Sequence, residues 1–326
     1  MGELYMGVEI GCTKQQAAVC ARNGSIVRMV GEKVPHPNGA ADILKWLEAT
    51  LRALIAAYPE IARIGYGFGG VLETKSGDLQ ASVQVPGWMG FHLREWSEEK
   101  FGRGSVVVND TVAGGYAERL LGSGRDSKVF FYTNIGTGIG GSLFIGDTTW
   151  DGIGFGAAYL GNTFTADWMA KEPGALTRIE DLCSGTAIER RLRTPGYIDS
   201  DSVMMKWCRG EAAKTDCRML HEALKAGDAF ALAEMERVGH TFGVGVANAV
   251  SMLGADTVSI GGGVANLGEY LIAPVRRAAD KYVFISGKGR FRVVQCELMD
   301  DNVPVGAALY ARDGFRTTPV NGRQSL

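Results

Sequence analysis

Histidine and paired cysteine are scarce in this chain. Only four of its 326 residues are histidine, and its six cysteines include no C-x-x-C pair. None of these residues has the spacing that holds zinc, so the sequence predicts no structural zinc site. The thiols are expected to be small buried side chains in a reducing compartment.

An excess of charge of one sign is also lacking. Lys and Arg number 34 against 36 Asp and Glu, a formal net charge of −2. This balance argues against nucleic acid as a partner. No residue before Lys14 is basic, which does not fit a signal peptide. The uncharged run at 129–146 contains five glycines, which favours a turn over a membrane span. We therefore expect a cytoplasmic protein with no membrane partner.

Two common nucleotide-binding signatures are missing. No G-x-x-x-x-G-K-[ST] sequence occurs, which excludes a P-loop. The G-x-G-x-x-G spacing occurs twice, starting at Gly65 and Gly136. A dinucleotide site also needs a helix after the glycines and an acidic residue about 20 positions further on. The first copy has neither and the second leads into a hairpin, so both contexts argue against a Rossmann site.

Glycine, in contrast, is abundant, with 46 of 326 residues, about twice the usual ~7%. Two Gly/Thr turns, at 11–14 and 136–141, each follow an apolar strand-like run. Such turns can bring backbone N–H groups and a hydroxyl close to phosphate oxygens. Each turn alone could be ordinary hairpin geometry. Two of them, one in each half of the chain, suggest two lobes that close on one polyphosphate.

A carboxylate follows a third apolar run, which ends in Asn109-Asp110. An Asp with a pKa near ~3.9 is ionised at neutral pH and can accept a proton. A phosphate clamp with an Asp nearby is what phosphoryl transfer to a hydroxyl requires. The alternative is that Asn-Asp only caps a helix. Taken together, the turns and the carboxylate indicate a small-molecule kinase.

Strand-like and helix-like segments alternate, which indicates an α/β fold, and the length favours two domains. Strands are expected at residues 4–10, 15–21, 25–34, 61–68, 106–108, 129–133, 142–145, 148–150 and 257–260. Helices are expected at residues 39–58, 92–101, 111–121, 184–193, 216–225, 228–253, from about 267, and at 303–311.

The order of these motifs resembles the ROK family of sugar kinases and sugar-responsive regulators, within the actin/hexokinase-type ATPase superfamily. The resemblance covers nearly the whole chain and includes both phosphate segments, E-I-G-C-T-K at 9–14 and G-T-G-I-G-G at 136–141. The shorter family elements are found at 65–73, Pro86-Gly87-Trp88, Asn109-Asp110, Glu180 with Ser184-Gly185, I-G-G-G-V at 260–264, and G-A-A-L at 306–309.

The resemblance implies a two-lobed actin/hexokinase-like (ribonuclease H-like) α/β fold with a nucleotide/sugar cleft between the lobes. The smaller N-terminal lobe would comprise residues 1–112 plus 303–326, and the larger C-terminal lobe residues 113–302. It also implies Mg²⁺ with ATP, a small-molecule sugar as the other ligand, and a homodimer.

Site residues follow from the same resemblance. Asp110 would be the catalytic base, and Glu9 would lie near the nucleotide Mg²⁺. The expected substrate-binding residues are Gly70, Asn109, Asp110, Tyr159, Asn162 and Glu180. The expected nucleotide-binding residues are Gly11, Cys12, Thr13, Lys14, Gly136, Thr137, Gly138, Gly261, Gly262 and Gly263, the last three of which could instead form only a tight crossover.

Several positions depart from the family pattern. The family's G-E-L-G-H reads A-Y-L-G-N at 158–162, so Tyr159 and Asn162 replace a sugar-binding Glu and His. The zinc motif C-x-C-G-x-x-G-C has no counterpart between Asn162 and Glu180. Glu9 replaces Asp, which keeps a carboxylate, and Cys12 replaces Gly, which narrows the first phosphate turn.

The leading hypothesis is an ATP-dependent hexose kinase of glucokinase type, active in carbohydrate metabolism. The alternatives are a catalytically impaired sugar-binding ROK protein and a kinase for another sugar, such as an N-acylhexosamine. A ROK-type repressor is a weaker alternative, because the first phosphate turn begins at residue 11 and leaves no room for a DNA-binding segment. The sequence leaves open which sugar is used and whether ATP or polyphosphate is the donor.

Overall fold

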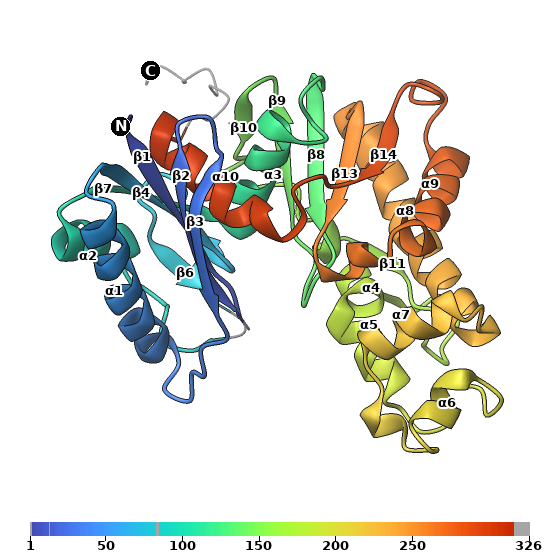
Figure 1. Ribbon diagram of the computed structural model, residues 1–326. Helices are drawn as coiled ribbons and strands as arrows, with labels where there is room; N and C mark the ends of the chain where they lie inside the picture. The colour runs from blue at the N-terminus through green and yellow to red at the C-terminus, as the bar shows by residue number, and fades with distance from the viewer. Residues whose placement is uncertain (1, 13, 83–84, 316–326) are drawn as a thin grey trace. The chain divides into compact units, whose positions relative to one another are not determined.

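The computed structural model describes residues 2–12, 14–82 and 85–315 (Figure 1). The chain forms two compact units. The first comprises Met1–Ser127, Ser142–Ala158 and Glu297–Leu326, and the second Lys128–Gly141 and Tyr159–Cys296. The sequence analysis expects lobe boundaries at residues 112 and 302, and these remain a proposal. The division into compact units differs from them, because it assigns residues 113–127 and 142–158 to the first unit.

The first unit is built on a five-stranded sheet in the order β3-β2-β1-β4-β7. Its strands are β1 (Leu4–Ile10), β2 (Gln15–Ala21), β3 (Ile26–Glu32), β4 (Ile61–Phe68) and β7 (Gly104–Asn109). β1, β2 and β3 pair antiparallel, whereas β1, β4 and β7 run parallel. The parallel register places Ile10 opposite Phe68 and Phe68 opposite Asn109. Three strands therefore end at one edge of this sheet.

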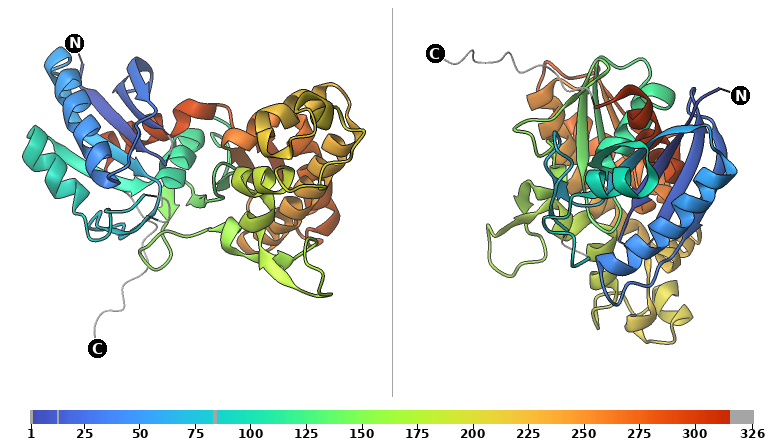
Figure 2. Two further views of the ribbon diagram at one scale, coloured as in Figure 1. Left: turned by 90° about the horizontal axis from the view of Figure 1, so that it is seen from below. Right: turned by 90° about the vertical axis from the view of Figure 1, so that its left-hand side faces the viewer.

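One face of this sheet carries the apolar core. Met6 and Val8 point to this face and are fully buried in a cluster with Leu47 and Leu51 of α1 (Ala40–Ala57). The apolar residues of α1 recur at helical spacing, which is why this segment lies along the sheet (Figures 1 and 2). α2 (Leu93–Phe101) adds Leu93 and Phe101 to the same cluster.

Glycines line the opposite face, where α10 (Asn302–Asp313) packs against β1 and β4. A Cβ atom at Gly7 would lie 1.8 Å from the carbonyl oxygen of Pro304, and one at Gly65 would lie 1.8 Å from that of Ala307. Gly306 approaches α3 (Asp110–Leu121) equally closely, since its Cβ would lie 1.8 Å from the carbonyl oxygen of Ala113. These glycines allow the backbones of the sheet and the helices to pack closely. Such packing explains the glycine at position 65, where the first G-x-G-x-x-G sequence starts, without a dinucleotide site.

A second five-stranded sheet has the order β10-β9-β8-β13-β14. Its strands are β8 (Val129–Asn134), β9 (Gly141–Ile145), β10 (Thr148–Trp150), β13 (Thr257–Gly261) and β14 (Arg292–Gln295). β13 runs parallel to β8, with Gly261 opposite Asn134. The turn at 136–141 and the glycines at 261–263 therefore follow neighbouring strand ends.

Helices make up most of the second unit. They are α4 (Ile179–Cys183), α5 (Gly185–Leu192), α6 (Val203–Trp207), α7 (Cys217–Lys225), α8 (Ala229–Leu253) and α9 (Glu269–Tyr282). Short elements complete the described chain: β5 (Val71–Leu72), β6 (Leu79–Ala81), β11 (Phe164–Ala166), β12 (Leu176–Arg178), and 3₁₀ turns at Leu160–Asn162, Ala212–Lys214, Gly263–Leu267 and Met299–Asp301. None of the helices in the described ranges is long and apolar enough to cross a bilayer.

Candidate active site

The ends of β1, β4 and β7 bring together three sequence motifs of the first unit. Gly11 follows β1, Gly69 follows β4, and Asp110 follows β7. The backbone N–H of Gly69 donates to the carbonyl oxygen of Ile10 at 3.0 Å, so the first two strand ends are joined beyond the sheet. The parallel register thus explains why motifs about 40 to 60 residues apart in the sequence share one site.

Asn109 fixes the position of the carboxylate that follows it. Its side-chain oxygen accepts from the backbone N–H of Thr111 at 2.9 Å and caps α3. Its Nδ2 donates to the carbonyl oxygen of Gly70 at 3.0 Å. The helix-cap interpretation of Asn109-Asp110 is therefore correct for Asn109. In this arrangement Asn109 holds the start of α3 against the Gly69-Gly70 turn.

Asp110 presents its carboxylate at this turn. Its Oδ1 accepts from the N–H of Thr111 at 2.8 Å, and its Oδ2 lies 3.4 Å from the place that a Cβ at Gly69 would occupy. Burial raises the pKa of Asp110 to about 6, although hydrogen bonds from Thr111 and Asn109 favour the ionised form. This pKa is higher than that of a free Asp, but the group is still mostly ionised at neutral pH, as the sequence analysis expects. A carboxylate with a pKa nearer to neutrality is a stronger proton acceptor.

Glu9 places a second carboxylate in the same region. Its Oε2 accepts from Nε2 of Gln16 at 2.8 Å. Burial, with a smaller contribution from the charge of Asp110, raises the pKa of Glu9 to about 7. A partly buried carboxylate that accepts from a neutral amide fits a divalent cation, because Mg²⁺ prefers oxygen ligands and is commonly held by one or two carboxylates plus substrate phosphates.

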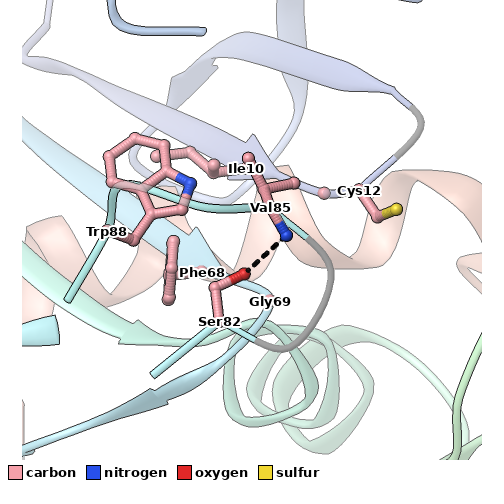
Figure 3. Close-up of a pocket in the computed structure, with 8 residues that line it drawn as sticks. Ile10, Cys12, Phe68, Gly69, Ser82, Val85 and Trp88 are labelled. Atoms are coloured by element: carbon pink, nitrogen blue, oxygen red, sulfur yellow. Dashed lines mark hydrogen bonds between the residues drawn. The ribbon is translucent and has the colours of Figure 1, made fainter. Parts of the chain in front are cut away.

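The first Gly/Thr turn is described at Gly11, Cys12 and Lys14, whereas Thr13 lies outside the described residues. Nε2 of Gln15, a residue that the sequence analysis did not single out, donates to the carbonyl oxygen of Gly11 at 2.8 Å. Burial raises the pKa of the Cys12 thiol, so this side chain is neutral near pH 7. Cys12 also lines a small pocket (Figure 3) with Ile10, Gly11, Phe68, Gly69, Ser82, Val85 and Trp88.

The second Gly/Thr turn belongs to the second unit. The N–H of Gly136 donates to the carbonyl oxygen of Gly138 at 2.9 Å, and that of Gly140 to Oδ1 of Asn134 at 2.7 Å. The turn is therefore closed by its own backbone and by the last residue of β8. Thr137 at its tip is exposed, which leaves its hydroxyl accessible to a ligand.

Glu180 contacts this turn, which the sequence did not predict. The N–H of Ile139 donates to its Oε2 at 2.7 Å. A Cβ at Gly138 would lie 2.6 Å from the same oxygen, so the carboxylate needs glycine at this position. Oε1 of Glu180 lies 3.9 Å from Nη1 of Arg178. The residue expected to bind sugar thus supports the second Gly/Thr turn through one of its two oxygens.

The residues that depart from the family pattern lie around the 3₁₀ turn at Leu160–Asn162. Tyr159 precedes this turn and is half-buried, and Asn162 at its end is exposed. Oδ1 of Asn162 accepts from Nη1 of Arg178 at 3.3 Å. Arg178 also donates to both oxygens of Asp181 at 2.9 Å. Arg178 is thus a polar residue of this region that the sequence analysis missed, since no motif includes it.

The three glycines after β13 have different surroundings. A Cβ at Gly261 would lie 2.4 Å from the hydroxyl of Tyr132, and Gly262 has a φ of +85° with the backbone of Ile135 beside it. These two glycines are required by packing and backbone geometry. Gly263 is exposed and has open space around its Cα, so it is the one of the three that leaves room for a ligand.

The segment that corresponds to the family's zinc motif does not fit zinc. Residues 163–179 contain no Cys and no His. Within the described ranges, no group of three or more His, Cys, Asp and Glu side chains is arranged to hold a metal ion. The segment instead forms the β11–β12 hairpin, in which Phe164 pairs with Arg178 and Ala166 with Leu176.

Comparisons with known proteins identify the family of this chain. The ROK family profile matches residues 5–314. A glucokinase of Thermotoga maritima is 29% identical over 93% of this chain and 95% of its own length. Among solved structures, a ROK family glucokinase from Streptomyces griseus in complex with glucose and AMPPNP has a TM-score of 0.79 at 24% identity, over 95% of this chain and 100% of that one.

A regulator is similar in structure as well. A ROK family transcriptional regulator, a homologue of the E. coli MLC protein, has a TM-score of 0.78 at 17% identity, over 96% of this chain and 78% of its own. The match across residues 5–314 covers both motif sets and both units. The chain therefore has the two-lobed actin/hexokinase-like fold and belongs to the ROK family.

Proposed function

We propose that this protein is a sugar kinase that transfers the γ-phosphoryl group of ATP to a hexose. The observation that carries the proposal is the carboxylate of Asp110, which lies at the end of β7 beside Gly69 and has a pKa of about 6. A relative named glucokinase and a structural neighbour in complex with glucose and AMPPNP support this class of substrates.

In the proposed reaction, Asp110 accepts the proton of a sugar hydroxyl as that oxygen attacks the γ-phosphorus. The P–O bond to the β-phosphate breaks, and ADP leaves. Asn109 keeps the base in position through its bonds to Thr111 and Gly70. A positioned general base contributes about 10²–10⁴ in rate. Bound Mg²⁺, which Glu9 would hold with the nucleotide, supplies charge neutralisation on the phosphates.

The two Gly/Thr turns are the proposed phosphate sites. At 136–141, the N–H groups of Gly136, Ile139 and Gly140 are already bonded within the protein, which favours the exposed tip at Thr137 and Gly138 for phosphate. Gly11, Cys12 and Lys14 are proposed for the first turn, together with Thr13. Gly263 is the favoured contact for adenosine among the three glycines after β13.

Gly70, Asn109 and Asp110 are proposed to bind sugar hydroxyls, and the same role is proposed for Tyr159, Asn162 and Glu180. Glucose is the first substrate to test. An N-acylhexosamine is the runner-up, because Tyr159 offers a hydroxyl and a flat apolar face where the family has a charged acceptor. The cytoplasmic location and the homodimer stay predictions from the sequence.

The test is a coupled ADP-release assay over hexoses, N-acylhexosamines and polyols, with ATP and polyphosphate compared as donors. Phosphorylation of one hexose that is lost in Asp110→Asn is the expected outcome. Turnover of no sugar with either donor would contradict the kinase proposal.

The second candidate function is sugar binding without catalysis. Two features favour it: Cys12 occupies a position of the first Gly/Thr turn where the family has Gly, and the Glu180 carboxylate is hydrogen-bonded to the second turn. Calorimetry distinguishes the candidates. Binding of a sugar without ATP turnover would support the second candidate, whereas binding with turnover supports the first.

A further inference from the structure

The β11–β12 hairpin buries little apolar surface of its own. Phe164 and Leu176, one on each strand, are 67% and 66% exposed. Three residue pairs form its ladder, which is short for an independent hairpin. Something outside the ladder must therefore fasten this segment to the rest of the second unit.

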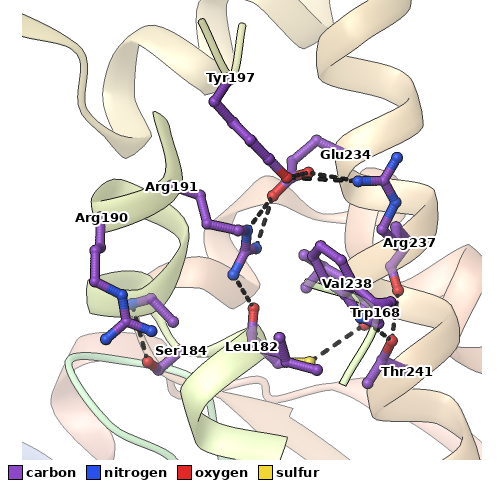
Figure 4. Close-up of polar contacts among 12 residues, drawn as sticks. Trp168, Leu182, Ser184, Arg190, Arg191, Tyr197, Glu234, Arg237, Val238 and Thr241 are labelled. Carbon is purple, nitrogen blue, oxygen red and sulfur yellow. Dashed lines mark hydrogen bonds and ion pairs between the residues drawn. The ribbon is translucent and has the colours of Figure 1, made fainter. Parts of the chain in front are cut away.

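Trp168, in the loop between the two strands, makes that contact. Its Nε1 donates to Oγ1 of Thr241 on α8 at 3.0 Å. The guanidinium carbons of Arg191 on α5 and Arg237 on α8 lie over its ring, 4.8 and 4.9 Å from the centroid. Figure 4 shows the indole among side chains that come from both helices.

The charges in this cluster explain why an aromatic ring fits there. Arg191 and Glu234 form an ion pair at 2.7 Å, with side chains only 4% and 1% exposed. Tyr197 donates to the other oxygen of Glu234 at 2.7 Å, and Arg237 lies 3.9 Å from that oxygen. Two guanidinium groups thus share one carboxylate, and the negative face of the indole attracts the remaining positive charge.

The hairpin leads directly into the proposed sugar site. Asn162 lies two residues before its first strand, Arg178 is its last residue, and Glu180 follows in α4. Arg191 also donates to the carbonyl oxygen of Leu182 in α4 at 2.6 Å. The cluster therefore joins the hairpin loop to α4, α5 and α8.

We propose that Trp168, clamped by Arg191 and Arg237, is a positioning residue that fastens the β11–β12 hairpin to α5 and α8. By fastening this segment, Trp168 fixes the positions of Asn162, Arg178 and Glu180, and it does not contact substrate itself. This inference rests on the proposed function for its effect on sugar binding. Its structural part, the fastening of residues 163–178, stands independently of that function.

The test compares Trp168→Ala and Trp168→Phe with Trp207→Ala, a matched control on α6 whose indole is 47% exposed. Two cation–π contacts of about 0.5–1 kcal/mol each correspond to a factor of roughly 5–30. Amide hydrogen exchange at 163–178 should therefore accelerate by about 5–30-fold in Trp168→Ala. Trp168→Phe, which keeps an aromatic face, should recover part of the protection, and Trp207→Ala should leave this segment unchanged.

Steady-state kinetics provide the second measurement. In Trp168→Ala the KM for the sugar should rise several-fold, while the KM for ATP stays within about twofold. Unchanged exchange at 163–178 in Trp168→Ala would overturn the fastening. Faster amide exchange would overturn the positioning role if it came with equal rises in the KM for sugar and the KM for ATP and a lower kcat. If the wild-type protein phosphorylates no sugar, the kinase proposal fails, but the exchange result still decides whether Trp168 fastens the hairpin.

Discussion

Oε2 of Glu180 lies 2.7 Å from the backbone nitrogen of Ile139, so a residue of α4 closes the Gly/Thr turn that precedes β9. This bond links the proposed sugar side of the second unit to its proposed phosphate side. The bond to Ile139 therefore gives Glu180 a structural role in this turn in addition to its proposed role in sugar binding.

We expect Glu180→Ala to weaken ATP as well as sugar binding. Leaving a buried N–H unsatisfied costs about 1–3 kcal/mol, and the loosened turn should raise the KM for ATP about tenfold. Glu180→Gln keeps an acceptor for Ile139 and should retain ATP binding better. Glu172→Ala, at an exposed carboxylate of the same unit, is the control. A rise in the sugar KM alone would show that the turn does not depend on Glu180.

Activity should fall in acid solution. Burial raises the pKa of Asp110 to about 6, and a protonated Asp110 cannot accept the sugar proton. We expect kcat/KM for the sugar to decline as the pH drops below about 6, rather than below about 4 as for an exposed Asp. A pH–rate profile that is flat from pH 7 to 5 would contradict this role of burial.

The stability that the Asp110 and Glu9 carboxyl groups contribute should fall as the pH rises, whereas activity should rise. The folded-state pKa values of Asp110 and Glu9 lie above the ordinary values of 3.8 and 4.5, at about 6 and about 7. Each group therefore contributes stability that is fully present below its ordinary pKa and is lost as the pH rises through about 6 and about 7. Without nucleotide or Mg²⁺, Asp110→Asn and Glu9→Gln should each raise Tm at pH 8 relative to the wild type. A lower Tm in both variants at that pH would show that these carboxylates stabilise the fold in their charged forms.

The purified protein should contain no stoichiometric zinc. A structural zinc site needs about four Cys or His ligands, and residues 163–179 contain neither. Chelators should therefore leave Tm unchanged, as measured in the absence of ATP and Mg²⁺. One zinc per chain by elemental analysis would contradict this prediction.

Tyr159 and Asn162 should set the sugar preference. Tyr159 lacks the charge of the family's Glu, whose hydrogen bonds to hydroxyls would be worth about 1.5–3 kcal/mol each. Asn162 is already engaged by Arg178 at 3.3 Å. If glucose is the substrate, Tyr159→Glu combined with Asn162→His should lower its KM. The matched measurement is the KM for an N-acylhexosamine in the same variant, and no change for either sugar would show that these side chains do not contact the ligand.

The sequence predicts the long elements well because their apolar patterns extend over many residues. The expected ranges of β1 and β4 agree with the observed Leu4–Ile10 and Ile61–Phe68. The hairpin of β11 and β12 and the five-residue helix α4 were missed, since three to five residues show no usable periodicity. Contacts made by Trp168 and Arg191 hold these short elements, and such contacts are not visible in local sequence.

The residue types of the proposed site can be read from the sequence, but the interactions of these residues in the folded chain cannot. The family motifs include Asp110 and Glu180, so both residues are candidates from the sequence. The raised pKa of Asp110, in contrast, depends on its burial in the folded chain. The contact between Glu180 and Ile139 joins residues 41 positions apart. Gln16, which holds Glu9, lies on a neighbouring antiparallel strand, a pairing that no motif records.

The central claim is that Asp110 is the general base of a hexose kinase, and one comparison tests it most directly. ADP release is measured with the best hexose of the panel for the wild type and for Asp110→Asn, with nucleotide and sugar binding measured in parallel. We predict that the variant binds both ligands and loses about 10²–10⁴ in kcat. Wild-type turnover in Asp110→Asn on that same sugar would contradict the account.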